Sequence, residues 1–172
     1  MRAWPRQLAC FALALLLGLW LGGCAHETAL QGQVVRVADG DTLTVRDGRD
    51  KTHRVRLAGI DAPEQGQAYG NASRQHLSQL AEGRQVEVRY RKVDDYGRVV
   101  GTVWLDGRDL NLAQLQAGLA WHYRHYQDEQ PRAERLAYAE AEAEARQARR
   151  GLWQEATPTP PWDYRRQRRP QR

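Results

Sequence analysis

Cysteine is scarce in this sequence of 172 residues, which contains only Cys10 and Cys24. Cys10 lies in an uncharged run rich in Leu and Ala, residues 8–21. That run is too short to cross a bilayer, which takes about 20 apolar residues. With Arg2 and Arg6 before it, the run is typical of the apolar region of a secretory signal. Removal of the signal would leave Cys24 alone, so the mature chain could form no intramolecular disulfide.

The end of the apolar run, Leu21-Gly22-Gly23-Cys24, resembles a bacterial lipobox. In signals of that kind the cysteine is lipidated and becomes the new N-terminus. The alternative is an ordinary cleaved signal that a chance cysteine follows. The resemblance predicts a lipoprotein-type signal peptide over residues 1–23 and a lipidated tether over residues 24–30. The protein would then be exported and held at a membrane of the cell envelope, on the periplasmic or cell-surface side.

A strong charge of one sign is also missing from the central part of the chain. Of 26 basic and 21 acidic residues, Arg2 and Arg6 fall in the predicted signal, and five arginines with one aspartate follow Thr157. Residues 27–156 therefore hold 19 basic and 20 acidic residues. This balance argues against a generally basic nucleic-acid binder, so positive charge must act locally.

Aliphatic residues are absent from the Pro/Arg-rich end of the chain. We predict that this tail, residues 156–172, is disordered. It could serve solubility, or it could attract nucleic acid or an anionic membrane surface. Zinc is not indicated, because the pair His122 and His125 has no third ligand near it in sequence.

What is present is a regular alternation of apolar and polar residues between turns, which predicts short strands. Helical spacing, each time followed by a glycine, predicts three helices. The expected fold is α+β, mainly β: a five-stranded OB-fold barrel with three helices over residues 31–155. The predicted strands are 33–37, 42–46, 51–57, 84–90 and 98–105, and two of the predicted helices are 67–82 and 132–150. A short helix through Ala117 lies between them, and either Asp109 or Asn111 can cap it.

Carboxylates stand where two of these strands turn. Asp41 leaves the first turn and Asp61 leaves the third strand, and adjacent antiparallel strands could bring these ends together. Two aspartates with a backbone carbonyl and waters suit Ca²⁺, and no nitrogen or sulfur ligand nearby favours zinc or copper. Asp39-Gly40-Asp41 alone would be weak support, because aspartate is common in turns.

A third acid and two arginines complete the set. Glu64 follows Pro63, which stiffens the turn, and a carboxylate there can act as a general base. Arg56 and Arg98 flank the turn from two strands, and guanidinium groups match phosphate oxygens. Singly, each would more often be an exposed loop acid or a surface arginine.

Taken together, residues 39–42, 56–64 and 94–98 resemble the signatures of the thermonuclease (staphylococcal nuclease-like) family. Residues 116–120 also resemble that family's segment after its second helix, and the resemblance covers about residues 33–153. It implies an OB barrel with three helices. It also implies a Ca²⁺ site that uses the side chains of Asp41 and Asp61 and the backbone carbonyl of Ala62.

The resemblance further implies the chemistry. Glu64 would activate the attacking water, and Arg56 and Arg98 would bind the phosphate and stabilise its transition state. DNA and RNA, preferably single-stranded, would be cleaved at the 5′ P–O bond to leave 3′-phosphates, by a monomer. Tyr96 would line the nucleotide pocket. Tyr123 would contact the base, with Trp121 and Tyr126 as alternatives.

Some features depart from the family pattern. Asp95 stands where a basic residue is common, the loop after Glu64 is short, and the core is near neutral. These departures are expected to weaken binding of nucleic acid more than they weaken the chemical step. A non-catalytic OB module that stacks bases on aromatic residues, or a structural envelope lipoprotein, are the alternative readings.

Overall fold

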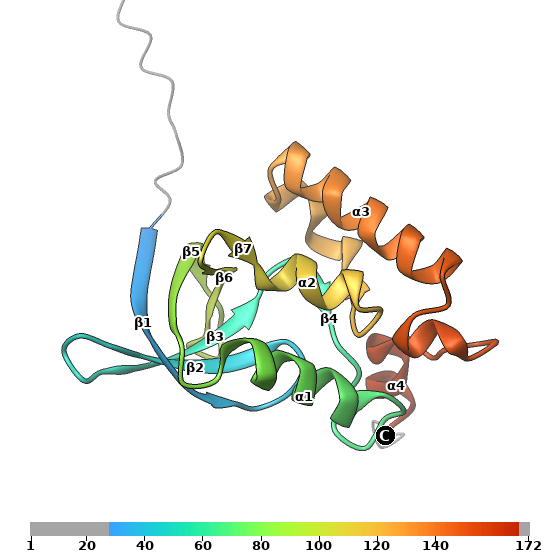
Figure 1. Ribbon diagram of the computed structural model, residues 1–172, viewed down its shortest axis with the longest axis horizontal. Coiled ribbons are helices and arrows are strands. Elements are labelled where there is room, and N and C mark those ends of the chain that lie inside the picture. Colours follow the sequence, from blue (N-terminus) through green and yellow to red (C-terminus); the bar gives the residue numbers. More distant parts are fainter. Residues whose placement is uncertain (1–27, 169–172) are drawn as a thin grey trace, which may run out of the picture.

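The computed structural model describes residues 28–168 (Figure 1). The predictions for the signal peptide and for the lipidated Cys24 lie outside these residues, as does the end of the tail, 169–172. Between residues 28 and 168, no helix is long and apolar enough to cross a membrane.

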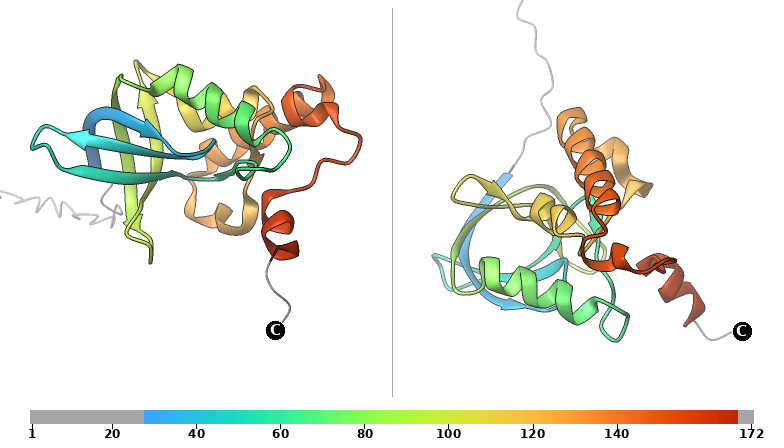
Figure 2. Two further views of the ribbon diagram at one scale, coloured as in Figure 1. Left: turned by 90° about the horizontal axis from the view of Figure 1, so that it is seen from below. Right: turned by 45° about the vertical axis from the view of Figure 1, so that its right-hand side comes forward.

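Five strands form a closed barrel, and their ranges are β1 (Thr28–Val37), β2 (Thr42–Asp47), β3 (Thr52–Leu57), β5 (Gln85–Val93) and β6 (Val99–Leu105). Neighbours pair antiparallel in the order β3-β2-β1-β5-β6, and a parallel pairing of β3 with β6 closes the ring (Figure 2). The predicted five-stranded α+β barrel is therefore confirmed. Outside the ring, β7 (Arg108–Asp109) extends from β6.

The barrel core follows from the alternation seen in the sequence, because successive strand side chains point to opposite faces. Apolar residues from all five strands point inward and are fully buried, among them Val34, Leu43, Val45, Val55 and Val88. The register shifts once in β1, between Val34 and Arg36, and once in β5, between Tyr90 and Lys92. Such bulges increase strand twist, which helps a small sheet to close on itself.

Three helices form where the sequence predicted them. They are α1 (Gly70–Ala81), α2 (Leu110–Gln116) and α3 (Arg132–Gln147), with short 3₁₀ turns at Arg124–Glu129 and Gly151–Gln154. A smaller apolar cluster forms beside the barrel from Trp121, Ala145, Leu152 and Trp153.

A two-stranded sheet was not predicted. It pairs β4 (Ile60–Asp61) with β8 (Trp121–His122), and Asp61 lies opposite Trp121. The pairing carries the chain that follows α2 back to the turn after β3. This pairing therefore holds Asp61 beside Trp121.

Two boundaries of the prediction are wrong. Residues 28–30 of the expected tether belong to β1, where Leu30 pairs with Val88 of β5. The backbone ladder of β5 extends this far and offers the polar segment hydrogen-bonding partners that composition alone does not reveal.

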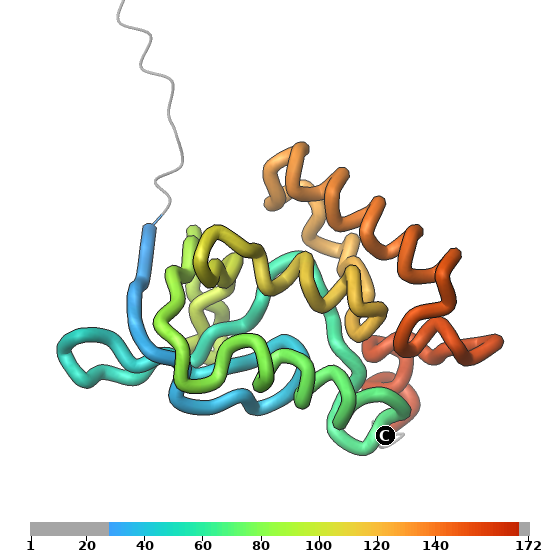
Figure 3. The backbone as a smooth tube through the Cα atoms, viewed as in Figure 1, coloured from blue at the N-terminus to red at the C-terminus, as the bar shows by residue number. Residues whose placement is uncertain are grey.

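The tail was predicted to be disordered, but it contains a fourth helix, α4 (Pro161–Gln167). Pro160 is extended and Pro161 takes the first helical position, which suits its fixed backbone angle and missing N–H. Pro161 is buried and Trp162 packs against Trp121. Figure 3 shows this end of the chain beside the loop that joins β4 to α1. The tail orders because it docks on the domain, although its composition could not form a core of its own.

The carboxylate of Asp47 holds the hairpin between β2 and β3, so changing this residue tests how much it stabilises the fold. Asp47 Oδ1 accepts hydrogen bonds from the backbone N–H groups of Arg49 (2.9 Å) and Lys51 (3.0 Å), and its Oδ2 lies 2.8 Å from His53 Nε2. The bond with His53 is the main cause that lowers the pKa of Asp47 from 3.8 to about 2. A carboxylate whose pKa falls on folding stabilises the fold above its unfolded pKa. That contribution is lost as the pH falls through about 2.

Asp47→Asn keeps an oxygen for the backbone but removes the charge that faces His53. We expect lower stability near neutral pH, and the gap to the unmodified protein should close as the pH falls from 3.8 toward about 2. Urea unfolding over a pH series measures this. Asp50→Asn, an exposed site on the same turn, is the matched control. A gap that stays constant through this pH range would contradict the role of the charge.

Candidate active site

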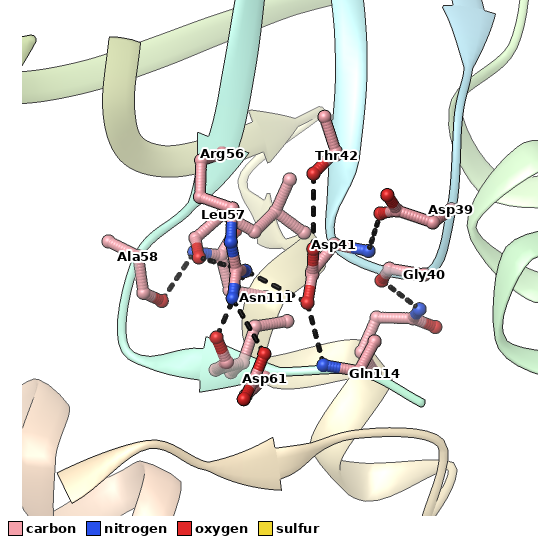
Figure 4. A network of polar contacts seen from close by, with 12 residues as sticks. Asp39, Gly40, Asp41, Thr42, Arg56, Leu57, Ala58, Asp61, Asn111 and Gln114 are labelled. Atoms are coloured by element: carbon pink, nitrogen blue, oxygen red, sulfur yellow. Dashed lines mark hydrogen bonds and ion pairs between the residues drawn. The ribbon is translucent and has the colours of Figure 1, made fainter. Parts of the chain in front are cut away.

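Two buried aspartates share one arginine at the mouth of the barrel (Figure 4). Arg56 Nη1 lies 2.9 Å from Asp41 Oδ2, and Arg56 Nη2 lies 2.9 Å from Asp61 Oδ1. The same guanidinium also donates to the carbonyl oxygens of Leu57 (3.2 Å) and Ile60 (3.1 Å). The structure thus brings together three of the residues that the sequence singled out.

Strand register explains why they meet. Arg56 of β3 lies opposite Thr42 of β2, and Leu57 donates its N–H to the carbonyl of Asp41 (2.8 Å). Val55 and Leu57 point into the core, so Arg56 points to the other face. Ala62 donates its N–H to Asp41 Oδ2 (2.6 Å), which ties the turn after β4 to the turn before β2.

The buried side-chain amide of Gln114 anchors the turn that carries Asp41. Gln114 of α2 donates from Nε2 to the carbonyl of Gly40 (2.6 Å) and to that of Ser73 (3.1 Å). A Cβ atom on Gly40 would stand 1.8 Å from the Ser73 hydroxyl, so only glycine fits there. The glycine of the Asp-Gly-Asp turn is therefore required by the close approach of α1.

A second buried amide holds the turn between Arg56 and Asp61. Asn111 donates from Nδ2 to the carbonyl oxygens of Ala58 (3.0 Å) and Gly101 (3.2 Å), and its Oδ1 accepts from Val103 N–H (3.1 Å). Sequence reasoning left the cap of α2 open between Asp109 and Asn111. Asp109 is the cap, since its side chain accepts from Leu112 N–H. Both anchoring amides were missed. The available signal was a short helical stretch in which apolar residues are interleaved with amides, of which Asn111 and Gln114 are buried.

Burial and charge act against each other at Asp41. Burial raises the pKa of Asp41 to about 7, Arg56 acts in the lowering direction, and Asp39 and Asp61 act in the raising direction. One guanidinium therefore does not fully compensate the two carboxylates. Such a site favours a further positive group nearby.

That further group is present, and the sequence did not predict it. Arg165 of α4 donates from Nη2 to Asp61 Oδ2 (2.8 Å) and from Nη1 to Asp61 Oδ1 (3.2 Å). Its Nη1 also bonds Glu64 Oε1 at 2.6 Å. Glu64 itself is placed by its backbone N–H, which donates to Gln67 Oε1 (3.0 Å). Glu64 thus joins the Asp41, Arg56 and Asp61 cluster through a residue of the tail.

Arg98 lies near Arg56 in the fold, but its side chain pairs with Asp94 instead of the two buried aspartates. It precedes Val99, which pairs with Val55 in the parallel ladder beside Arg56. Its guanidinium binds Asp94 Oδ2 through Nε (2.8 Å) and Nη2 (2.7 Å). Burial alone would raise the pKa of Asp94, but the bonds from Arg98 outweigh burial and lower it. The side chain of Tyr96 lies under Arg98 and is 80% exposed.

The three candidate base-contacting aromatics lie in different surroundings. Trp121 is buried in the second apolar cluster, with its ring 4.4 Å from that of Trp153. Tyr126 is exposed beneath Lys92. Tyr123 is half-buried, and its N–H donates to the carbonyl of Gly59 in the turn that leads to Asp61 (2.9 Å). Burial raises the pKa of Tyr123, and the nearby charge of Asp61 adds to the effect.

The donor set fits a hard cation. Over residues 28–168, no three or more His, Cys, Asp or Glu side chains are grouped so as to hold a metal ion by themselves. Two aspartates meet, as the sequence predicted, so other ligands would have to be backbone oxygens and waters. The guanidinium bridging Asp61 and Glu64 shows that these oxygens accommodate a positive group. Oxygen donors of this kind suit Ca²⁺.

Comparisons with known proteins identify the family of this chain. The profile of the family described as "Staphylococcal nuclease homologue" matches residues 54–155. The chain belongs to the staphylococcal nuclease family. It is 42% identical over 154 residues to an "Uncharacterized endonuclease" of Escherichia coli, which covers 89% of this chain and 94% of that protein.

Further relatives of the nuclease family extend the match. The chain is 41% identical over 145 residues to a "Micrococcal nuclease" of Shigella flexneri, covering 79% of this chain and 80% of the relative. It is 39% identical over 119 residues to the "Staphylococcal-like nuclease CAN1" of Arabidopsis thaliana, covering 69% and 35%. Helix α4 lies beyond the residues that the family profile matches.

The anchoring of the Asp41 turn can be tested through Gln114. Gln114→Met keeps the approximate length of the side chain but leaves the carbonyl of Gly40 and the groups of Ser73 without their buried donor. We expect the free energy of unfolding to fall by about 2 kcal/mol. Urea denaturation measures it. Gln116→Met, an exposed site on the same helix, is the control, and equal stability of the two variants would contradict the anchoring role.

Proposed function

We propose that this nuclease hydrolyses phosphodiester bonds of DNA and RNA in a Ca²⁺-dependent reaction, at the 5′ P–O bond, leaving 3′-phosphates. The observation that carries the proposal is the cluster of Asp41, Arg56 and Asp61, with Glu64 on the turn that follows. Family membership supplies the hydrolytic nuclease class, and the cluster suggests how this chain performs it.

Arg56 and Arg98 are assigned to the phosphate. A phosphodiester under attack gathers negative charge on its equatorial oxygens, and guanidinium donors match these oxygens in pairs. Arg56 is held rigidly by two acids and two carbonyls, so it is already oriented before substrate arrives. Arg98 would have to share or leave Asp94 to reach a phosphate.

Glu64 is assigned as the general base that takes a proton from the attacking water. The exposure of its carboxylate suits this role, because water and substrate can both reach it. Asp41 and Asp61 with the carbonyl of Ala62 would hold Ca²⁺. The ion would supply positive charge that neutralises the phosphate and favours ionisation of water.

The substrate side of the proposal rests on Tyr96 and Tyr123. Tyr96 offers an exposed ring beside Arg98, and Tyr123 offers a half-buried ring beside the Asp61 turn. Aromatic faces of this kind stack unpaired bases, so single-stranded DNA and RNA are the expected substrates. The protein is proposed to act as a monomer.

The proposal for catalysis is tested with Glu64→Gln. The amide cannot accept the proton from water, so kcat should fall by roughly 10²–10⁴-fold while binding of single-stranded DNA persists. The unmodified protein should cleave with Ca²⁺ and stop when a chelator is added. End-group analysis of the products should give 3′-phosphates.

Glu140→Gln, on the exposed face of α3, is the matched control and should cleave normally. Cleavage that continues in chelator would refute Ca²⁺ dependence. Nucleic-acid binding with no cleavage by the unmodified protein would favour the non-catalytic binding module instead.

We also propose that the nuclease is exported and anchored to a membrane of the cell envelope through a lipid on Cys24. The support is the lipobox-like sequence, residues 21–24. Several acyl chains on one cysteine would hold the enzyme at a membrane, whereas one chain gives only marginal binding.

Cys24→Ala should abolish incorporation of labelled palmitate and release the nuclease from the membrane fraction of a bacterial host. Cys10→Ala, inside the predicted signal, is the control and should stay labelled and membrane-bound. An unlabelled, soluble Cys10→Ala protein and an unlabelled, soluble parent protein would support the ordinary cleaved signal.

A further inference from the structure

The C-terminal segment, residues 156–168, reaches the proposed active site with a charged side chain. The guanidinium of Arg165 spans both oxygens of Asp61 and one oxygen of Glu64, at 2.6–3.2 Å. Asp61 is 1% exposed, whereas Arg165 is 42% exposed, so the arginine closes the site from the solvent side. Arg165 therefore bridges Asp61, which is assigned to bind the cation, and Glu64, which is assigned to accept the proton from water.

These contacts use the oxygens that the reaction needs. Asp61 Oδ1 is already shared by Arg56, and Oδ2 is taken by Arg165. A cation that bound Asp61 would therefore have to displace the guanidinium or accept repulsion from it. Glu64 is bound as well, so it could not at the same time receive a proton from water without weakening that bond.

The same segment covers the aromatic that was assigned to the base. The ring of Trp162 lies 5.6 Å from that of Tyr123 and 5.6 Å from that of Trp121. A base that stacked on Tyr123 would meet this indole. One short helix thus places a cation against the acids and an aromatic ring against the base-stacking position.

Besides the contacts of Arg165, Pro161 and Trp162, the segment makes two hydrogen bonds to the loop after Glu64. Gln67 donates from Nε2 to the carbonyl of Thr159 (2.7 Å), and Tyr164 donates from Oη to the carbonyl of Gly66 (3.2 Å). A cavity of about 170 Å³ remains along this seam, between Pro63 on one side and Pro158 on the other. The barrel core lies elsewhere, so the segment can leave without exposing that core.

We propose that residues 156–168 form an autoinhibitory latch, in which Arg165 takes the place of the cation at Asp61 and Glu64 while Trp162 covers Tyr123. The proposal rests on the proposed function of the site. Binding of Ca²⁺ and of nucleic acid opens the latch. A protein that binds a ligand only in its open state shows an apparent affinity reduced by the open fraction. The latch therefore weakens the apparent affinity for Ca²⁺.

The test measures Ca²⁺ binding directly, by calorimetry on the full chain in detergent. Arg165→Gln removes the charge and should tighten Ca²⁺ binding by roughly 3–10-fold. Arg165→Lys keeps the positive charge but loses the paired donors of the guanidinium. Its Ca²⁺ affinity should therefore fall between those of Arg165→Gln and the unmodified protein. Arg166→Gln is the matched control, because Arg166 is 76% exposed and pairs with Asp163 on its own helix. It should bind Ca²⁺ like the unmodified protein.

Opening of the latch is read separately by limited trypsin digestion with mass spectrometry. Ca²⁺ should speed cleavage after Arg165 in the unmodified protein, and Arg165→Lys should already be cut faster at that position without Ca²⁺. Trp162→Leu removes the other contact and should also tighten Ca²⁺ binding. It serves as a second variant that leaves the charges of the site untouched.

The outcomes separate the latch from the function. Equal Ca²⁺ affinity in Arg165→Gln, Trp162→Leu and the unmodified protein, with normal cleavage of nucleic acid, would overturn the latch and leave the proposed function standing. A loss of turnover in Arg165→Gln at unchanged Ca²⁺ affinity would also overturn it, and would make Arg165 a substrate-binding residue. Absence of Ca²⁺ binding in all of these proteins would overturn the latch and the Ca²⁺ dependence together.

Discussion

The ion pairs of Arg56 with Asp41 and Asp61 are the interaction on which the rest of the site depends. Two buried carboxylates repel each other and resist ionisation, and a cation between them opposes both effects. Arginine suits this place because it stays charged at any working pH and has enough donors to bind two acids and two carbonyls at once. Removing one partner of such a buried set would leave an uncompensated charge, which is strongly destabilising. The geometry of the acids is therefore coupled to the closure of β2 on β3.

The site divides into a rigid half and an exposed half. Asp41, Arg56 and Asp61 are fixed by strand register and by the buried amides of Gln114 and Asn111, which tie two turns to α2. Glu64 and Arg98 lie at the rim, and each is held by an oppositely charged neighbour. In the proposed mechanism, these rim residues exchange an internal partner for water or phosphate. Substrate affinity then depends on the strength of these internal pairs as well as on contacts with the substrate.

Sequence reasoning succeeded where periodicity and turn chemistry were strong. The alternation around Val55 predicted the strand that aims Arg56 outward, and the turn residues predicted the turn from which Asp41 leads into β2. It failed where a tertiary partner decides local structure. Two-residue strands such as Ile60–Asp61 have no periodicity to read, and they exist because β8 lies beside them.

The tail shows the same limit in another form. Its composition forms no core, which argued for disorder, yet Trp162 and Pro161 find apolar partners on a neighbouring surface. A signal was present in Pro161 at a helix start, with Asp163 in the first turn and Arg166 in the last, an arrangement that complements the helix dipole. What no local pattern could supply was the partner of Arg165, because Asp61 lies about a hundred residues earlier.

The nearly neutral charge of the domain limits how strongly it can attract nucleic acid. With 19 basic and 20 acidic residues over 27–156, the domain has little general attraction for a polyanion. The tail adds further arginines, among them Arg165 beside Asp61 and Glu64. While Arg165 is bound to Asp61 and Glu64, its positive charge is neutralised by those acids. In the proposed latch, a cation that binds there returns Arg165 to the surface beside the site. Cation binding and attraction of nucleic acid would then reinforce each other, which a permanently basic domain could not achieve.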